Sequence, residues 1–123
     1  MKHYFRILFI AMLMSPLYVA ADVMHYSLCT LSDGKTMADA QAWVNDWRQL
    51  VDRKGVNYKI RLLVPHASPE EPGQFFIEGS STTLSTYAAA WEWWYSDQDA
   101  AASASQIESV APCDSGAVYL TAD

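Results

Sequence analysis

The chain has 123 residues, a formal net charge of −6 and a hydrophobic fraction of 51%, which suit one domain with its own core. No Lys or Arg follows Arg61, whereas most Asp and Glu residues do, so binding to nucleic acid is not expected and anionic membranes are disfavoured. The simplest explanation of the acidic charge is that it keeps the protein soluble.

Residues 1–21 have the pattern of a secretory signal peptide. A positively charged start leads into a short apolar stretch at 7–14, which Pro16 interrupts, and small residues precede the expected cleavage after Ala21. A membrane anchor is the alternative, but spanning needs about 20 apolar residues. We therefore predict a periplasmic or secreted protein whose mature part, residues 22–123, is one domain without membrane attachment.

Apolar and more polar side chains alternate along residues 23–30, which predicts a first strand. We expect this strand to turn His25 and Ser27 away from the helices. Its buried face would then consist of Met24, Tyr26 and Leu28.

The most clearly predicted element is an amphipathic helix at residues 36–55. Thr36 can cap its start together with Asp39, and Gly55 can supply a left-handed stop. Apolar side chains recur at spacings of three and four along one side, which is the expected buried stripe. That stripe consists of Met37, Ala40, Val44, Trp47 and Val51, flanked by Trp43 and Leu50.

Two strands are expected after this helix. Alternation along 56–64 predicts the second strand with Arg61 facing outward, and the short apolar run at 74–78 predicts the third. Three prolines at 65–73 exclude a helix or a central strand between them.

A second helix is predicted at 84–97, and the Ala- and Ser-rich residues 98–110 form a weaker helix after a break. Trp93 points away from the expected apolar face at helical spacing, so it is the exposed Trp of this helix and a contact residue. The expected apolar face consists of Leu84, Tyr87, Ala88, Trp91, Trp94 and Tyr95. A last strand follows at 116–121.

The order of the main elements, βαββαβ, predicts an α+β domain of the ferredoxin-like type, with a four-stranded antiparallel sheet and two helices on one face. The first and last strands are neighbours in that arrangement. Cys29 ends the first strand and Cys113 precedes the last, so the two cysteines of an exported chain are predicted to form a disulfide.

Sequence motifs point to no particular reaction. The chain has no P-loop, no dinucleotide fingerprint and no H-E-x-x-H or G-x-S-x-G motif. The histidines of the mature part, His25 and His66, are isolated in sequence, so neither a metal nor a cofactor is expected. The catalytic residues, if the protein is an enzyme, stay unknown at this stage.

A surface is the best candidate for a binding site. With the strand orientations above, one sheet face carries His25, Ser27, Arg61 and Tyr119. Such a face is either solvated, paired with a second subunit, or the floor of a pocket. Trp93 is the second candidate, because an exposed Trp suggests a partner, a sugar-like ligand or a dimer contact.

A strand with a His near its start, a helix with an aromatic and aliphatic stripe, and then β-β-α-β resembles the dimeric α+β barrel superfamily over residues 23–121. That group includes stress-responsive barrel proteins and small monooxygenases. The resemblance implies a homodimer whose sheets pack face to face, ligands inside the barrel or between sheet and helices, and His25 as a polar group of the interior. Export and a disulfide are departures from its usual members.

Two functions follow from this interpretation. The first is a non-catalytic exported module that dimerises through its sheet and binds a small molecule or a protein. The alternative is a cofactor-independent, monooxygenase-like enzyme that uses His25, with Tyr119 or Arg61, to position an aromatic substrate. The first is preferred because the sequence lacks a convincing acid–base pair.

Overall fold

A computed structural model of the chain describes residues 21–67 and 70–122. Apart from Ala21, the predicted signal peptide lies outside these residues. Along the chain the described elements are β1 (Val23–Thr30), α1 (Met37–Lys54), β2 (Lys59–Leu63), β3 (Gln74–Ser81), α2 (Leu84–Ser96), α3 (Gln98–Val110) and β4 (Ala117–Leu120). None of the described helices is long and apolar enough to cross a membrane.

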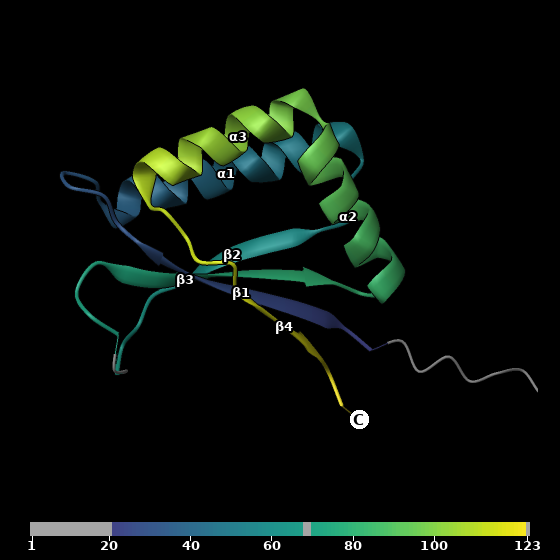
Figure 1. The fold of residues 1–123 in the computed structure, drawn as a ribbon, viewed down its shortest axis with the longest axis horizontal. Coiled ribbons are helices and arrows are strands. Elements are labelled where there is room, and N and C mark those ends of the chain that lie inside the picture. The colour runs from purple at the N-terminus through teal and green to yellow at the C-terminus, as the bar shows by residue number, and fades with distance from the viewer. Residues whose placement is uncertain (1–20, 68–69, 123) are drawn as a thin grey trace, which may run out of the picture.

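The four strands form one antiparallel sheet in the order β2-β3-β1-β4. All three helices lie on one face of this sheet, with α1 and α3 side by side and α2 at an angle to them (Figure 1). The predicted ferredoxin-like α+β fold is confirmed. The weak helix predicted at 98–110 is a full third helix, and Asp97 separates it from α2.

Helix α1 forms as its sequence predicts. Thr36 and Asp39 make a reciprocal capping box, and Gly55 ends the helix with a φ of 66°. The buried side chains are those of the predicted stripe: Ala40, Trp43, Val44, Trp47, Leu50 and Val51. This face packs on β2 and α3 and supplies most of the larger of the two core clusters.

The predicted orientation of β1 is wrong. Val23 and Cys29 are fully buried, and His25, which lies between them on the same face, is 8% exposed. His25 and Ser27 therefore point toward the helices, while Met24, Tyr26 and Leu28 lie on the open face. Both faces of this strand carry apolar side chains, so alternation alone did not reveal which one the helices cover.

The predicted stripe of α2 is also wrong. Ala90 is its buried residue, whereas Leu84 and Tyr95 are 59% and 80% exposed. Trp93 and Trp94 are half-buried and pack against the core that α1 forms. Almost every side of this helix carries an aromatic or Ala residue, so its spacing does not define one apolar stripe.

The strand boundaries differ modestly from the prediction. The third strand continues to Ser81 instead of ending at 78, because Gly79, expected in a turn, pairs with both His25 and Ile60. The second strand begins only at Lys59. Tyr58, just before it, packs its ring against Trp47.

A disulfide joins Cys29 to Cys113, as predicted, and closes a sequence separation of 84 residues. The two cysteines also face each other as an isolated bridge beside β1 and β4. For a loop of this length, the chain-entropy model gives roughly 4 to 5 kcal/mol of stabilisation, and any native strain reduces that figure.

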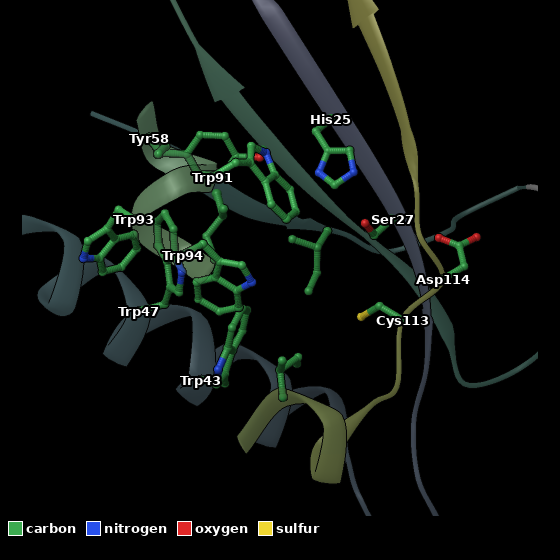
Figure 2. Close-up of a pocket in the computed structure, with 15 residues that line it drawn as sticks. His25, Ser27, Trp43, Trp47, Tyr58, Trp91, Trp93, Trp94, Cys113 and Asp114 are labelled. Atoms are coloured by element: carbon green, nitrogen blue, oxygen red, sulfur yellow. The ribbon is translucent and has the colours of Figure 1, made fainter. Parts of the chain in front are cut away.

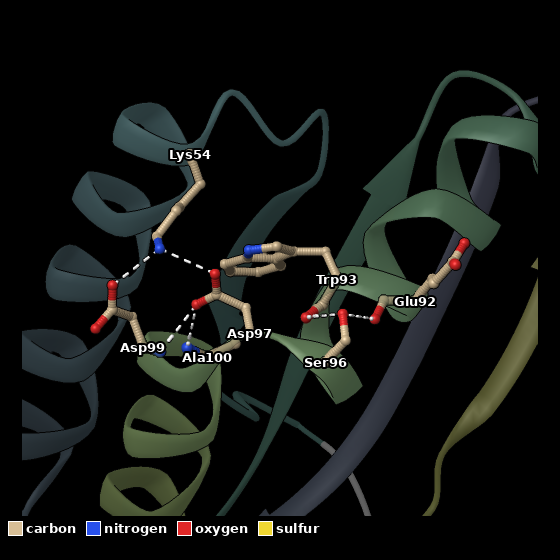
Figure 3. A network of polar contacts seen from close by, with 7 residues as sticks. All are labelled: Lys54, Glu92, Trp93, Ser96, Asp97, Asp99 and Ala100. Atoms are coloured by element: carbon tan, nitrogen blue, oxygen red, sulfur yellow. Dashed lines mark hydrogen bonds and ion pairs between the residues drawn. The ribbon is translucent and has the colours of Figure 1, made fainter.

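Ion pairs connect the end of α1 to the residues at the junction of α2 and α3 (Figure 3). The Lys54 ammonium pairs with the carboxylates of Asp97 and Asp99, each at 2.9 Å. Asp97 also accepts from the backbone N–H groups of Asp99 and Ala100 as the N-cap of α3. The hydrogen bond from Lys54, and then that from Ala100, lower the pKa of the Asp97 carboxyl.

We predict that Asp97→Asn lowers the thermal unfolding midpoint at neutral pH. Because the folded-state pKa of Asp97 lies below its ordinary 3.8, the ionised carboxylate stabilises the fold fully above that value. The contribution is lost as the pH falls through the lowered pKa, so the two proteins should converge in acid. Asp52→Asn, on the exposed side of α1, is the matched control, and an equal loss there would contradict the assignment.

Candidate binding site

A cavity of about 200 Å³ lies between the helix-covered face of the sheet and helices α1, α2 and α3 (Figure 2). Its lining is mostly aromatic and aliphatic, and β1 and the segment before β4 contribute an imidazole, a hydroxyl and a carboxylate. The lining residues are His25, Ser27, Trp43, Trp47, Tyr58, Ile60, Ile77, Gly79, Ala90, Trp91, Trp93, Trp94, Ile107, Cys113 and Asp114.

Two helices supply the tryptophans of the wall. Trp43 and Trp47 stand one turn apart on the buried stripe of α1, and α2 contributes Trp91, Trp93 and Trp94. The Trp43 indole donates to the Ser103 carbonyl of α3 at 2.9 Å, which fixes that ring between the two helices. The result is a wall of π faces that favours a flat apolar ligand.

Tyr58 closes the cavity over Gly79. A Cβ at Gly79 would collide with the Tyr58 hydroxyl, so the absence of a side chain there is what lets the ring lie against the sheet. Burial raises the pKa of Tyr58 well above its ordinary 10.0, and the hydroxyl stays protonated. The Trp91 indole offsets part of this rise, although its N–H finds no acceptor of good geometry among the described residues.

His25, Ser27 and Asp114 form the polar end of the cavity. Figure 2 shows them together beside Cys113, across from the tryptophans. The Asp114 carboxylate is held by the backbone N–H groups of Leu28 and Gly116, each at 3.0 Å. His25 packs edge-on against Trp91, with ring centroids 5.1 Å apart, so the polar end adjoins the aromatic wall directly.

The structure divides the predicted site residues between two faces. His25, Ser27 and Trp93 line the cavity. Arg61 and Tyr119 lie on the open face, where Arg61 pairs with the buried carboxylate of Glu78 and Tyr119 packs on Tyr26. The single sheet face that was expected to carry His25 together with Arg61 and Tyr119 is therefore wrong, because β1 is turned over.

The prediction that Trp93 points into solvent is wrong as well. Its ring packs against the core cluster of α1 and β2, and its indole N–H is buried without an acceptor among the described residues. The exposed aromatic residue of α2 is Tyr95, which is 80% exposed and packs on Trp91.

The sequence does not identify several lining residues as site residues. The positions of Trp43 and Trp47 predict core residues, and that of Tyr58 predicts only a strand residue. Asp114 follows Cys113 directly, so the predicted disulfide was the one signal that would have brought this carboxylate to the end of β1. Within residues 21–67 and 70–122, no group of three or more His, Cys, Asp or Glu side chains is arranged for a metal ion.

Fold and site together define a ferredoxin-like α+β domain with an aromatic cavity between sheet and helices. Among solved structures, the chain is similar to SnoaB, a cofactor-independent oxygenase from Streptomyces nogalater, with a TM-score of 0.57 and 8% identity over 85% of this chain and 96% of that one. No family model matches the sequence. No curated protein matches it either.

A second similar structure is a dimeric protein of unknown function with a ferredoxin-like fold from Bacteroides fragilis. Its TM-score is 0.50 and its identity 14%, over 81% of this chain and 96% of that one. At such identities the likeness is one of fold. Both comparisons agree with the predicted ferredoxin-like fold.

The packing of Trp93 leads to a stability prediction. Trp93→Ala should lower the free energy of unfolding by roughly 2 to 4 kcal/mol, somewhat less than the 3 to 5 typical of a fully buried ring. Tyr95→Ala on the same helix should cost about 1 kcal/mol or less, because only its contact with Trp91 is lost. Urea unfolding at matched slope measures both. Equal losses would show that α2 is not oriented as described.

Proposed function

We propose that this protein is an exported, non-catalytic module that binds a small aromatic molecule in the cavity between its sheet and helices. The observation that carries the proposal is the lining: aromatic and aliphatic side chains make the walls, and His25, Ser27 and Asp114 gather at one end. An apolar cavity of about 150 Å³ holds benzene, so about 200 Å³ suits one ring with a few further atoms.

Export belongs to the same proposal. The signal-peptide pattern at 1–21 supports a mature domain, residues 22–123, that is periplasmic or secreted. The Cys29–Cys113 disulfide supports this location, because such bonds persist in oxidising compartments.

Binding is tested by filling the cavity. Ala90 is buried and lines the cavity from α2, so Ala90→Leu should abolish the binding of a single-ring probe such as indole, measured by calorimetry. Ala89→Leu, on the exposed side of the same helix, is the matched control and should bind as the wild type does. Circular dichroism checks that both variants fold. Unchanged indole affinity in Ala90→Leu would contradict this site.

The alternative function is a cofactor-independent, monooxygenase-like enzyme. It is supported by a titratable side chain, His25, in the lining of the cavity and by the fold likeness to an oxygenase of that kind. Oxygen uptake in the presence of a bound phenolic probe distinguishes the two functions. Oxygen uptake that is lost when His25 is substituted would support the enzyme and contradict the non-catalytic module.

We further propose that the protein is a homodimer joined across its open sheet face. That face has no described element over it, and the paired rows of the ladders place on it Lys59, Arg61, Glu78 and Ser80 together with a larger apolar group. The apolar group consists of Met24, Tyr26, Leu28, Leu63, Phe76 and Tyr119. An antiparallel sheet can leave one face in water, but a face with this many apolar side chains is typical of an interaction surface. The dimeric nature of one fold relative supports a second copy as that cover.

The dimer predicts that Leu28→Asp, on the open face, yields a monomer by light scattering, because each copy would bury an unpaired carboxylate in the interface. Leu84→Asp is the control, since Leu84 is 59% exposed on α2 and should leave the dimer intact. A monomeric wild-type protein at micromolar concentration would contradict the face-to-face arrangement.

A further inference from the structure

The two ring nitrogens of His25 have different surroundings. Figure 2 shows one nitrogen on the side of the segment that leads into β4, and the other on the side of Trp91. His25 is 8% exposed, and its edge-on contacts with Trp91 and Tyr87 hold the ring in this orientation.

The nitrogen toward β4 is Nε2, which lies 3.4 Å from the Ser115 carbonyl oxygen. A carbonyl can only accept a hydrogen bond, so Nε2 carries the proton in this pair. The backbone also closes off this side, because a Cβ at Gly116 would collide with Nε2 and with the Ser27 hydroxyl. In the neutral imidazole, Nδ1 is then a hydrogen-bond acceptor.

Nδ1 is on the side of the aromatic wall. None of the hydrogen bonds found in the described part of the chain ends on it, and His25 belongs to the cavity lining. A ligand in the cavity therefore meets Nδ1 as a free acceptor in a largely apolar setting, where a hydrogen bond counts for more than in water.

The other polar groups at this end strengthen the same preference. The Asp114 carboxylate only accepts, and the Ser27 hydroxyl can accept or donate. Among the described residues, no Lys or Arg lines the cavity. A carboxylic acid would therefore find no permanent positive charge there and would lie near the Asp114 carboxylate. Acidic ligands are therefore disfavoured.

We infer that the cavity selects single-ring aromatic molecules that carry a hydroxyl or N–H donor, which they give to His25 Nδ1, over aromatic ethers and aromatic acids. This inference rests on the proposed binding function and names its ligand class. It assigns His25 as a residue that determines specificity through a defined tautomer.

The test compares phenol with anisole, which differ in the donor hydrogen, by calorimetry on the wild-type protein and on His25→Phe. Phenylalanine keeps a flat ring at this position but has no hydrogen-bond acceptor. The wild type should prefer phenol by about tenfold, the effect of one net hydrogen bond. In His25→Phe this preference should fall toward one, while anisole still binds.

His66→Phe, at an exposed histidine outside the cavity, is the matched control and should keep the phenol preference. The imidazole nitrogen spectrum of the wild type adds a readout that needs no variant: it should show the Nε2-protonated tautomer, with Nδ1 shifting on addition of phenol. Binding of both probes without a preference, or the opposite tautomer, would overturn this inference alone. Binding of neither probe would overturn the proposed function with it.

Discussion

The joint between β1 and the segment that leads into β4 is the constraint on which both the fold and the cavity depend. The Cys29–Cys113 disulfide closes it covalently, and the backbones of Thr30 and Asp114 bond across it to Pro112 and Leu28. Since β4 has only four residues and exposed side chains, its own packing contributes little. The disulfide and these hydrogen bonds therefore hold β4 against β1.

The same joint builds the polar end of the cavity. With Cys113 tied to Cys29, the next residues must run along β1, and this brings Asp114 and Ser115 beside Ser27 and His25. A close backbone approach is needed here, and Gly116, at a φ of 73°, permits it. The same contacts therefore hold β4 in place and form the polar end of the cavity.

The two faces of the sheet differ in how their side chains are packed. On the helix side, glycine and small side chains under large rings leave a space that the core does not fill, an arrangement that costs packing energy unless a ligand occupies it. The open face has apolar side chains on both sides of the Arg61–Glu78 pair. Glu78 is buried there although no described helix covers it, because Tyr26 and Arg61 flank it in the same row of the sheet.

Local features of the sequence determined much of this structure. The capping box at Thr36, the stop at Gly55 and the stripe of α1 are formed by near neighbours along the chain, so they could be predicted from spacing alone. The order of strands and helices, with the short connections it requires, was enough to predict the sheet and the pairing of the two cysteines.

Which face of β1 and which side of α2 are buried was decided only by tertiary packing. Alternation shows that a strand has two faces, but both faces of β1 are apolar enough to be buried, and a one-residue shift exchanges them. Helix α2 is apolar around most of its circumference, so the contacts with α1 and α3 selected its buried side. The cavity depends on both choices, and for that reason His25 and Trp93 could be named from the sequence but not placed together.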